Sequence, residues 1–124
     1  MRPVSTEVLE SGVIQPAFFM FSQVWHDDVD SINNRLFKPF FANSPHALGA
    51  VYIEGTAHYD FSDLPLLSPL APQLGLKGPI NGKRVTTIVD DYLLSFFDAM
   101  LKGKAEKLFE SSPYPEIHGA IDTN

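Results

Sequence analysis

The sequence predicts an α/β fold, in which short buried strands alternate with helices. Two short and nearly continuous apolar segments, residues 13–22 and 47–54, are typical of strands in a parallel sheet that is covered on both faces. A segment with apolar residues at helical spacing lies between them, and a longer one follows at residues 85–101. The order strand, helix, strand implies a right-handed parallel crossover.

Composition narrows the classes of protein to which the chain can belong. It has 124 residues, 44% of them hydrophobic and 12% aromatic, which is enough for a single core. The net charge of −6, from 9 basic and 15 acidic residues, leaves no basic stripe to neutralise phosphates, so we expect no nucleic-acid partner. The absence of cysteine excludes disulfides, thiolate metal sites and a cysteine nucleophile. With no apolar run of signal-peptide or membrane-spanning length, we expect a soluble protein.

In the first half of the chain, the pattern predicts a loop, a strand, a loop and a helix in turn. The polar N-terminus is predicted to be a loop with one helical turn around Glu7–Glu10. After the strand of residues 13–22, the polar residues 23–28 are predicted to be a loop at the edge of the sheet. Apolar residues three and four positions apart then predict a helix over residues 28–38, which Pro39 ends.

In the second half, one long helix dominates. The strand of residues 47–54 is followed by an apolar stretch, residues 64–72, whose three prolines predict a covering loop with helical turns. The long helix is predicted to start near Asn81 or Gly82 and to be capped by Lys102–Gly103. Nine apolar positions share one of its faces: Val85, Ile88, Val89, Tyr92, Leu93, Phe96, Phe97, Met100 and Leu101.

The end of the chain differs in character from the rest. From Glu106 on the sequence is polar and contains Pro113 and Pro115, which predicts a loose tail. We therefore divide the chain into a partial α/β domain, residues 1–105, and a tail, residues 106–124.

A histidine follows the second strand and is the strongest candidate for a catalytic residue. The apolar run breaks at Gly55, which allows a sharp exit, and the small residues Thr56 and Ala57 lead to His58. Residues just beyond the carboxyl end of a buried strand are rigidly held and free to meet a ligand. Histidine is the side chain best suited to act as a general base near neutral pH. On spacing alone, a histidine that shortly follows a buried strand is more often structural than catalytic.

Other polar groups give weaker signals. His26 with Asp27, Asp28 and Asp30 has no spacing specific to a metal, so these residues are interpreted as a solvated helix start. Residues 78–83 lack the length and the following serine or threonine of a phosphate loop. His46 and His118 lie in polar loop sequence and are assigned no role. No Gly-x-Ser-x-Gly elbow occurs in the chain.

Four stretches together resemble a known family. They are residues 14–22, residues 51–63, residues 76–80 and the final amphipathic helix, and they resemble the C-terminal part of the plasma-type platelet-activating factor acetylhydrolases. The resemblance covers roughly residues 13–102, and its most specific piece is Gly-Thr-Ala-His-Tyr-Asp-Phe-Ser-Asp at residues 55–63. Members of this family are serine esterases with the α/β-hydrolase fold.

The resemblance implies a Ser-Asp-His triad that acts on short acyl esters, such as the acetyl group of platelet-activating factor, without a metal or organic cofactor. His58 matches the catalytic histidine of the family. The elbow serine, the oxyanion-hole residues and the aspartate have no match in this chain, and the family's acid falls just before Met1. We therefore expect the C-terminal portion of a longer enzyme, with an incomplete sheet of about two parallel strands and no activity on its own.

The partners expected from this reading are an ester or phospholipid substrate, and either the N-terminal half of the same domain or a second copy of the chain. Residues 64–76 are a candidate for peripheral lipid contact, although packing over the core explains them as well. Two alternatives stay open. One is a non-catalytic homologue that acts as an interaction module, and the other is a carboxylesterase or polyester hydrolase with a soluble or polymeric substrate.

Overall fold

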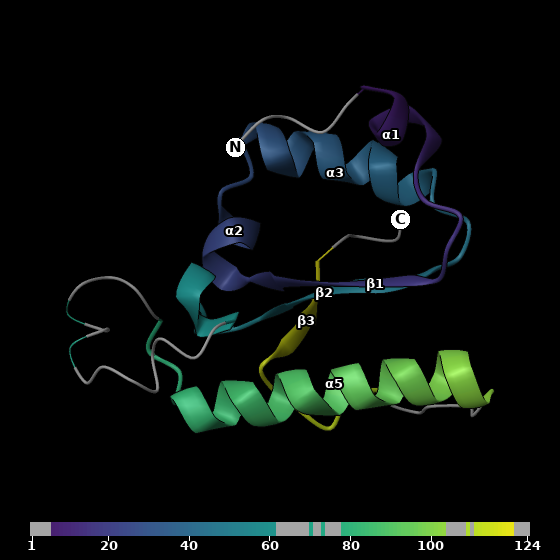
Figure 1. Cartoon of the computed structure of the whole chain (residues 1–124). Coiled ribbons are helices and arrows are strands. Elements are labelled where there is room, and N and C mark those ends of the chain that lie inside the picture. Colours follow the sequence, from purple (N-terminus) through teal and green to yellow (C-terminus); the bar gives the residue numbers. More distant parts are fainter. Residues whose placement is uncertain are drawn as a thin grey trace.

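The computed structural model describes residues 6–61, 70, 73, 78–103, 109 and 111–120. A three-stranded sheet lies between α1, α2 and α3 on one side and α5 on the other, which confirms the α/β class (Figure 1). The described elements are α1 (Thr6–Ser11), β1 (Ala17–Ser22), α2 (Gln23–Asp27), α3 (Ile32–Ala42), β2 (Ala47–Ile53), the 3₁₀ turn η1 (His58–Phe61), α5 (Gly82–Lys102) and β3 (Ile117–Gly119).

The sheet has the strand order β1-β2-β3, with β2 in the middle. β1 and β2 pair in parallel from Ala17 opposite Ala47 to Ser22 opposite Ile53, as the strand, helix, strand order predicts. β1 begins four residues later than predicted, directly after Pro16, which has no N–H to contribute to a ladder. The parallel pair brings the carboxyl ends of β1 and β2 to the same edge of the sheet.

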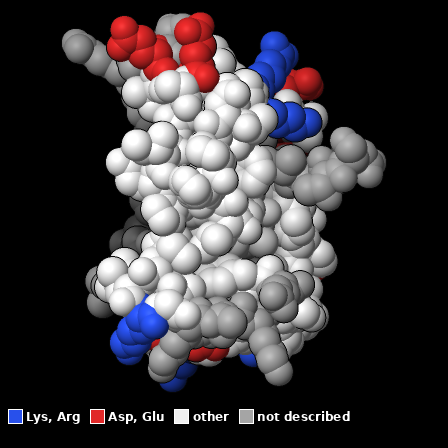
Figure 2. Space-filling model, turned by 90° about the vertical axis from the view of Figure 1, so that its right-hand side faces the viewer, with Lys and Arg blue, Asp and Glu red and all other residues white. Residues whose placement is uncertain are grey.

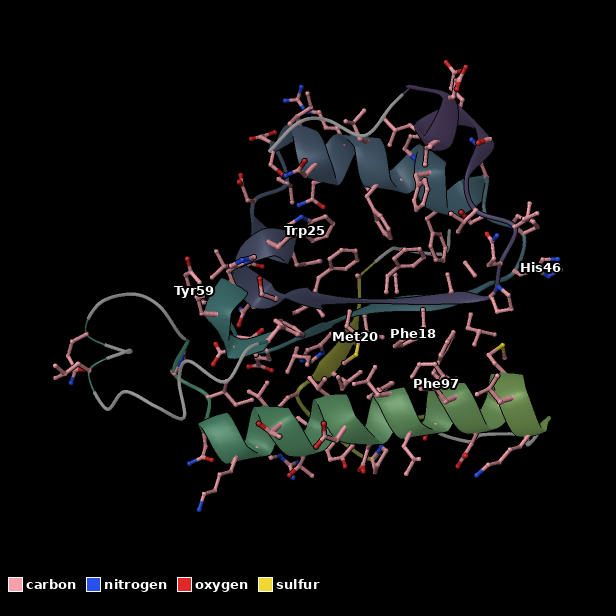
Figure 3. The ribbon with its side chains drawn as sticks, in the orientation of Figure 1. Phe18, Met20, Trp25, His46, Tyr59 and Phe97 are labelled. Carbon is pink, nitrogen blue, oxygen red and sulfur yellow. The ribbon has the colours of Figure 1, made fainter. Side chains whose placement is uncertain are left out.

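Side chains of β1 alternate between the two helical layers. Phe19 packs edge-on against Phe37 of α3, with ring centroids 5.1 Å apart. Phe18 stacks on Tyr92 of α5 at 5.3 Å, and Phe18 and Met20 both point toward α5 (Figure 3). Both faces of β1 are therefore apolar, which explains its continuous apolar sequence.

The first helical layer differs from its predicted form in two respects. α3 begins at Ile32 because the Ser31 hydroxyl accepts a hydrogen bond from the Asn34 N–H, 3.2 Å away, and caps the helix there. It also continues through Pro39 to Ala42, so the prediction that Pro39 ends the helix is wrong. Aromatic residues of α3 on both sides of the proline, Phe37, Phe40 and Phe41, pack around Phe19 and hold the last turn against the sheet.

Residues 23–27, predicted to be a loop, form the short helix α2. The Ser22 hydroxyl caps it by accepting a hydrogen bond from the Trp25 N–H at 3.1 Å. Trp25 then stacks on Phe21 with ring centroids 3.8 Å apart. The predicted helical turn near the N-terminus is confirmed as α1.

α5 begins and ends where the sequence predicts. The Asn81 side chain accepts hydrogen bonds from the N–H groups of Lys83 and Arg84 and caps the first turn. Gly103 takes the left-handed conformation, with φ 67°, and closes the last turn.

Part of the predicted tail is ordered against the sheet. Residues 111–120, here called the C-terminal strap, contain β3, which pairs antiparallel with β2 and places Ile117 opposite Ile53. The Arg84 guanidinium donates two hydrogen bonds to the Glu116 carboxylate, at 3.0 and 3.2 Å, and lies over the Tyr114 ring. These contacts join residues about 30 positions apart, so local sequence gives no sign of them. The division of the chain at residue 105 stays a prediction.

The core lies between the sheet and α5. Among the described residues, the fully buried hydrophobic side chains are Ile53, Val85, Ile88 and Tyr92. No side chain of α3 is fully buried, and several large apolar side chains of α5 are more than half exposed, among them Leu94 and Phe97. The apolar surface of the two helical layers is thus only partly covered.

Two predictions, for residues 64–72 and 64–76, concern a segment of which the structure describes only single residues. The covering loop of residues 64–72 and the lipid contact at residues 64–76 lie outside the described residues, apart from Leu70 and Gln73. Within the described ranges, no helix has both the length and the apolar character needed to cross a lipid bilayer.

Candidate active site

The carboxyl end of β2 turns sharply and exposes His58. Gly55 has φ 80°, a conformation that other residues rarely adopt, and it redirects the chain directly after the strand. Thr56 is fully buried, and its hydroxyl donates a hydrogen bond to the Ile53 carbonyl at 2.6 Å. His58 then begins η1 with an exposed side chain, and the ring of Tyr59 lies edge-on to the imidazole at 5.1 Å.

The neighbouring strand end fixes this turn from one side. Gln23 follows β1, and its side-chain oxygen accepts a hydrogen bond from the Gly55 N–H at 2.7 Å. The Gln23 N–H in turn donates to the Thr56 hydroxyl at 3.2 Å. The parallel pairing of β1 and β2 is what brings these residues together, although they are more than 30 positions apart.

The segment before α5 fixes the turn from the other side. The buried Asp60 carboxylate accepts hydrogen bonds through Oδ2 from the N–H groups of Ala57, at 2.7 Å, and Gly78, at 2.8 Å. The Ile80 N–H donates to the Gly55 carbonyl at 3.2 Å. Each of these contacts depends on residues that are distant along the chain or on the exact path of the turn, so the sequence pattern predicts none of them.

The other histidines lie elsewhere. His46 precedes β2 and is therefore at the opposite end of the strand from His58, as the positions of His46 and Tyr59 in Figure 3 show. His26 and His118 both stack on Tyr52, at 3.9 and 5.2 Å between ring centroids. His118 also pairs with Glu54 through Nε2 and Oε2, 2.9 Å apart.

The acidic residues around His26 are solvated, as predicted: Asp27, Asp28 and Asp30 are exposed and lie shortly before α3. His26 itself lies in α2, with its ring against Tyr52, and pairs with Asp27 at 3.2 Å. In the part of the chain that the structure describes, no three His, Cys, Asp or Glu side chains converge on a point where a metal ion would bind.

An apolar groove of about 330 Å³ lies between β1 and α5. Phe61, the last residue of η1, forms part of its wall, so the groove begins beside the His58 turn. Phe18 and Met20 line it from the sheet, and Phe96 and Phe97 line it from α5 (Figure 3). Among the described residues, no charged side chain lines the groove.

Charged residues are also unevenly distributed on the face at the amino end of β1. Figure 2 shows acidic and basic side chains at the top and bottom of this face, and the described residues across its middle are uncharged. Ile14 and Leu101, which are 72% and 78% exposed, are the most exposed large apolar side chains among the described residues.

The sequence was compared with curated proteins and with models of protein families. No curated protein sequence matches it. The family model for platelet-activating factor acetylhydrolase, isoform II, matches residues 1–111, which are 111 of the 124 residues and include both parallel strands, the His58 turn and α5. The protein therefore belongs to the platelet-activating factor acetylhydrolase family, whose members are lipid ester hydrolases.

Proposed function

We propose that this protein carries the general base of a serine esterase that hydrolyses short acyl esters of phospholipids, and that the base is His58. The observation that carries the proposal is the presentation of His58: an exposed imidazole on a turn at the carboxyl end of the central strand, within the stretch matched by the family. This edge of an α/β sheet is where such folds place their ligands.

The chemistry proposed for His58 is proton transfer. Its imidazole takes the proton from a serine hydroxyl as the serine oxygen attacks the ester carbonyl, and it then gives that proton to the departing alcohol. In the second half of the reaction the same imidazole activates a water molecule, which cleaves the acyl-serine ester. A carboxylate at the other ring nitrogen holds the tautomer that this cycle requires.

In this proposal the serine comes from outside residues 1–124, because no nucleophile elbow occurs in the sequence. The carboxylate also comes from outside, because no aspartate of the chain matches the position of the family's acid. We propose that the elbow-bearing part of the same domain is the first partner of this chain. β1 is the end strand of the described sheet, and its outer edge is a site where a further strand can pair. Such a strand would also cover the adjoining apolar groove.

The experiment uses a polypeptide that joins residues 1–124 to an upstream Gly-x-Ser-x-Gly elbow and aspartate, called here the elbow-bearing form. It is expected to release acetate from a 2-acetyl phospholipid and to be labelled at serine by a fluorophosphonate. The chain of residues 1–124 alone is expected to do neither. The proposal is wrong if the elbow-bearing form is folded and hydrolyses no ester.

The substrate class is tested in the same assay. A lipid substrate predicts a higher rate once the ester forms micelles, whereas an esterase for soluble or polymeric esters predicts equal rates on dispersed and micellar substrate. A rate that does not change across the critical micelle concentration favours the second class.

The exposed groove favours one further candidate function, that of a non-catalytic interaction module. In that case the groove between β1 and α5 binds another chain and His58 has no catalytic role. A stable complex of residues 1–124 with a second polypeptide, without any esterase activity in the complex, is the result that would support it.

A further inference from the structure

One buried carboxylate ties the His58 turn to the chain segment that leads into α5. Asp60 is 7% exposed, and its Oδ2 accepts hydrogen bonds from two backbone N–H groups, those of Ala57 and Gly78. The distances of 2.7 and 2.8 Å are those of charge-assisted hydrogen bonds, which are roughly twice as strong as neutral ones. The Ala57 N–H belongs to the peptide unit between Thr56 and Ala57, and the Asp60 N–H donates to the Ala57 carbonyl at 3.1 Å, so Asp60 also holds the peptide unit that joins Ala57 to His58.

The second bond extends this connection to a separate segment. Gly78 lies 18 positions after Asp60 and approaches the turn so closely that a Cβ atom there would come within 1.9 Å of the Gly55 oxygen. The Ile80 N–H adds a hydrogen bond to the same Gly55 carbonyl. Residues 55–60 and 78–80 therefore form one hydrogen-bonded unit, and α5 begins two residues later at Gly82.

The unit leaves the imidazole itself exposed while it fixes the backbone that leads up to His58. Gln23 holds Gly55 and Thr56 on the strand side, and Asp60 holds Ala57 on the helix side. With the peptide units before His58 fixed at both ends, the direction of the His58 Cα–Cβ bond is fixed as well. A catalytic base must be held within a fraction of an ångström of its productive position, and such precision comes from supporting hydrogen bonds.

We propose that Asp60 is a positioning residue for His58: through its bonds to Ala57 and Gly78 it sets the orientation of the imidazole at the carboxyl end of β2. The proposal rests on the proposed function, in which His58 is the general base. Asp60 acts through the backbone and takes no part in proton transfer. Its loss therefore lowers the rate of the chemical step and leaves substrate binding nearly unchanged.

The test compares variants of the elbow-bearing form. Asp60→Ala is expected to lower kcat by about 10²-fold with little change in KM, the size of effect that a small misplacement of a catalytic group produces. Asp60→Asn keeps an oxygen acceptor for the two N–H groups and is expected to recover most of kcat. In residues 1–124 alone, hydrogen exchange at the Ala57 and Gly78 amides is expected to speed up in Asp60→Ala.

Asn81→Ala is the matched structural control. It removes the N-cap of α5 close to the same segment but leaves the bonds of Asp60 in place, so it is expected to lower stability without lowering kcat. Equal losses of kcat in Asp60→Ala and Asn81→Ala would show a merely structural role for Asp60 and overturn the proposal. If Asp60→Ala does not fold, Asp60→Glu replaces it. That variant keeps the charge but displaces the carboxylate, so an unchanged kcat there overturns the proposal too.

His58→Ala separates failure of this proposal from failure of the proposed function. If His58→Ala abolishes turnover while Asp60→Ala retains the wild-type kcat, the positioning role is wrong and the general base stands. If His58→Ala itself retains its turnover, the proposed function is wrong and the positioning role is overturned with it.

Discussion

Gly78 is the residue at which the packing around the His58 turn leaves the least room. An added Cβ would lie 1.9 Å from the Gly55 oxygen and 2.6 Å from its carbonyl carbon, and both are backbone atoms that cannot rotate away. Gly78→Ala is therefore expected to lower the free energy of unfolding by at least about 2 kcal/mol, the range for overpacked sites. Urea denaturation of residues 1–124 measures this loss.

Gly103→Ala is the control for the effect of adding a methyl group to a glycine. Gly103 also has a positive φ, 67°, but nothing lies within 4 Å of its added Cβ. Only the backbone penalty of about 1 kcal/mol is expected there. Equal losses in the two variants would contradict the close approach of residue 78 to the turn.

For individual residues, the sequence predicts the position of His58 but not the residues that fix the turn on which it lies. The glycine, two small residues and a histidine after an apolar run are local signals, and they identify the exposed position. The hydrogen bonds that the Gly55 N–H donates to Gln23 and the Gly78 N–H donates to Asp60 depend on strand pairing and on the path of the chain before α5. Sequence periodicity carries no information about either.

Among the elements, the C-terminal strap is attached to α5 by the Arg84–Glu116 ion pair, by Arg84 over the Tyr114 ring, and by a hydrogen bond from the Tyr114 hydroxyl to Asp91. The hydrogen bonds from Arg84 lower the pKa of Glu116 below its ordinary value. A carboxyl group with a lowered pKa in the folded state stabilises that state above the unfolded pKa, and the stabilisation is lost as the pH falls through the folded value. We therefore expect β3 to loosen as the pH falls below about 4.

The amide chemical shifts of Ile117 and His118 measure this transition as the pH is lowered. Glu116→Gln is expected to remove it. Glu54→Gln is the control, because it removes the carboxylate that pairs with His118 and leaves the Arg84 pair intact. If the transition persists in Glu116→Gln and disappears in Glu54→Gln, it arises from the His118–Glu54 pair, and the prediction for Glu116 is wrong.

How well each element is predicted depends on whether local or tertiary interactions decide its bounds. α5 is predicted closely because its caps, Asn81 and Gly103, and its apolar face all lie within one stretch of sequence. α3 is predicted four residues out of place because the Ser31 cap sets its start and tertiary packing around Phe19 outweighs the helix-ending tendency of Pro39. β3 is missed entirely because three residues in a polar segment give no strand pattern of their own.

For the whole molecule, the central question is what covers the groove between β1 and α5. Few apolar side chains of the described residues are fully buried, and Phe97 in the groove is 52% exposed. We expect the isolated chain, of mass 13.8 kDa, to self-associate as its concentration rises. Sedimentation equilibrium measures this directly, and a monomer at every concentration would contradict the expectation.

Two substitutions on α5 locate the surface that associates. Phe97→Glu places a charge in the groove and is expected to shift the chain toward the monomer. Leu94→Glu is the control, because Leu94 is 62% exposed on the same helix but does not line the groove. If both variants weaken association equally, the groove is not the contact surface.

The turnover of His58→Ala in the elbow-bearing form, compared with that of His46→Ala, tests the central claim most directly. Both substitutions remove an exposed imidazole at an end of β2, but only His58 lies at the carboxyl end. We predict that His58→Ala lowers kcat by about 10⁴-fold or more and remains folded, and that His46→Ala retains its rate. A folded His58→Ala variant with a rate within about tenfold of the wild type would contradict the assignment of His58 as the general base.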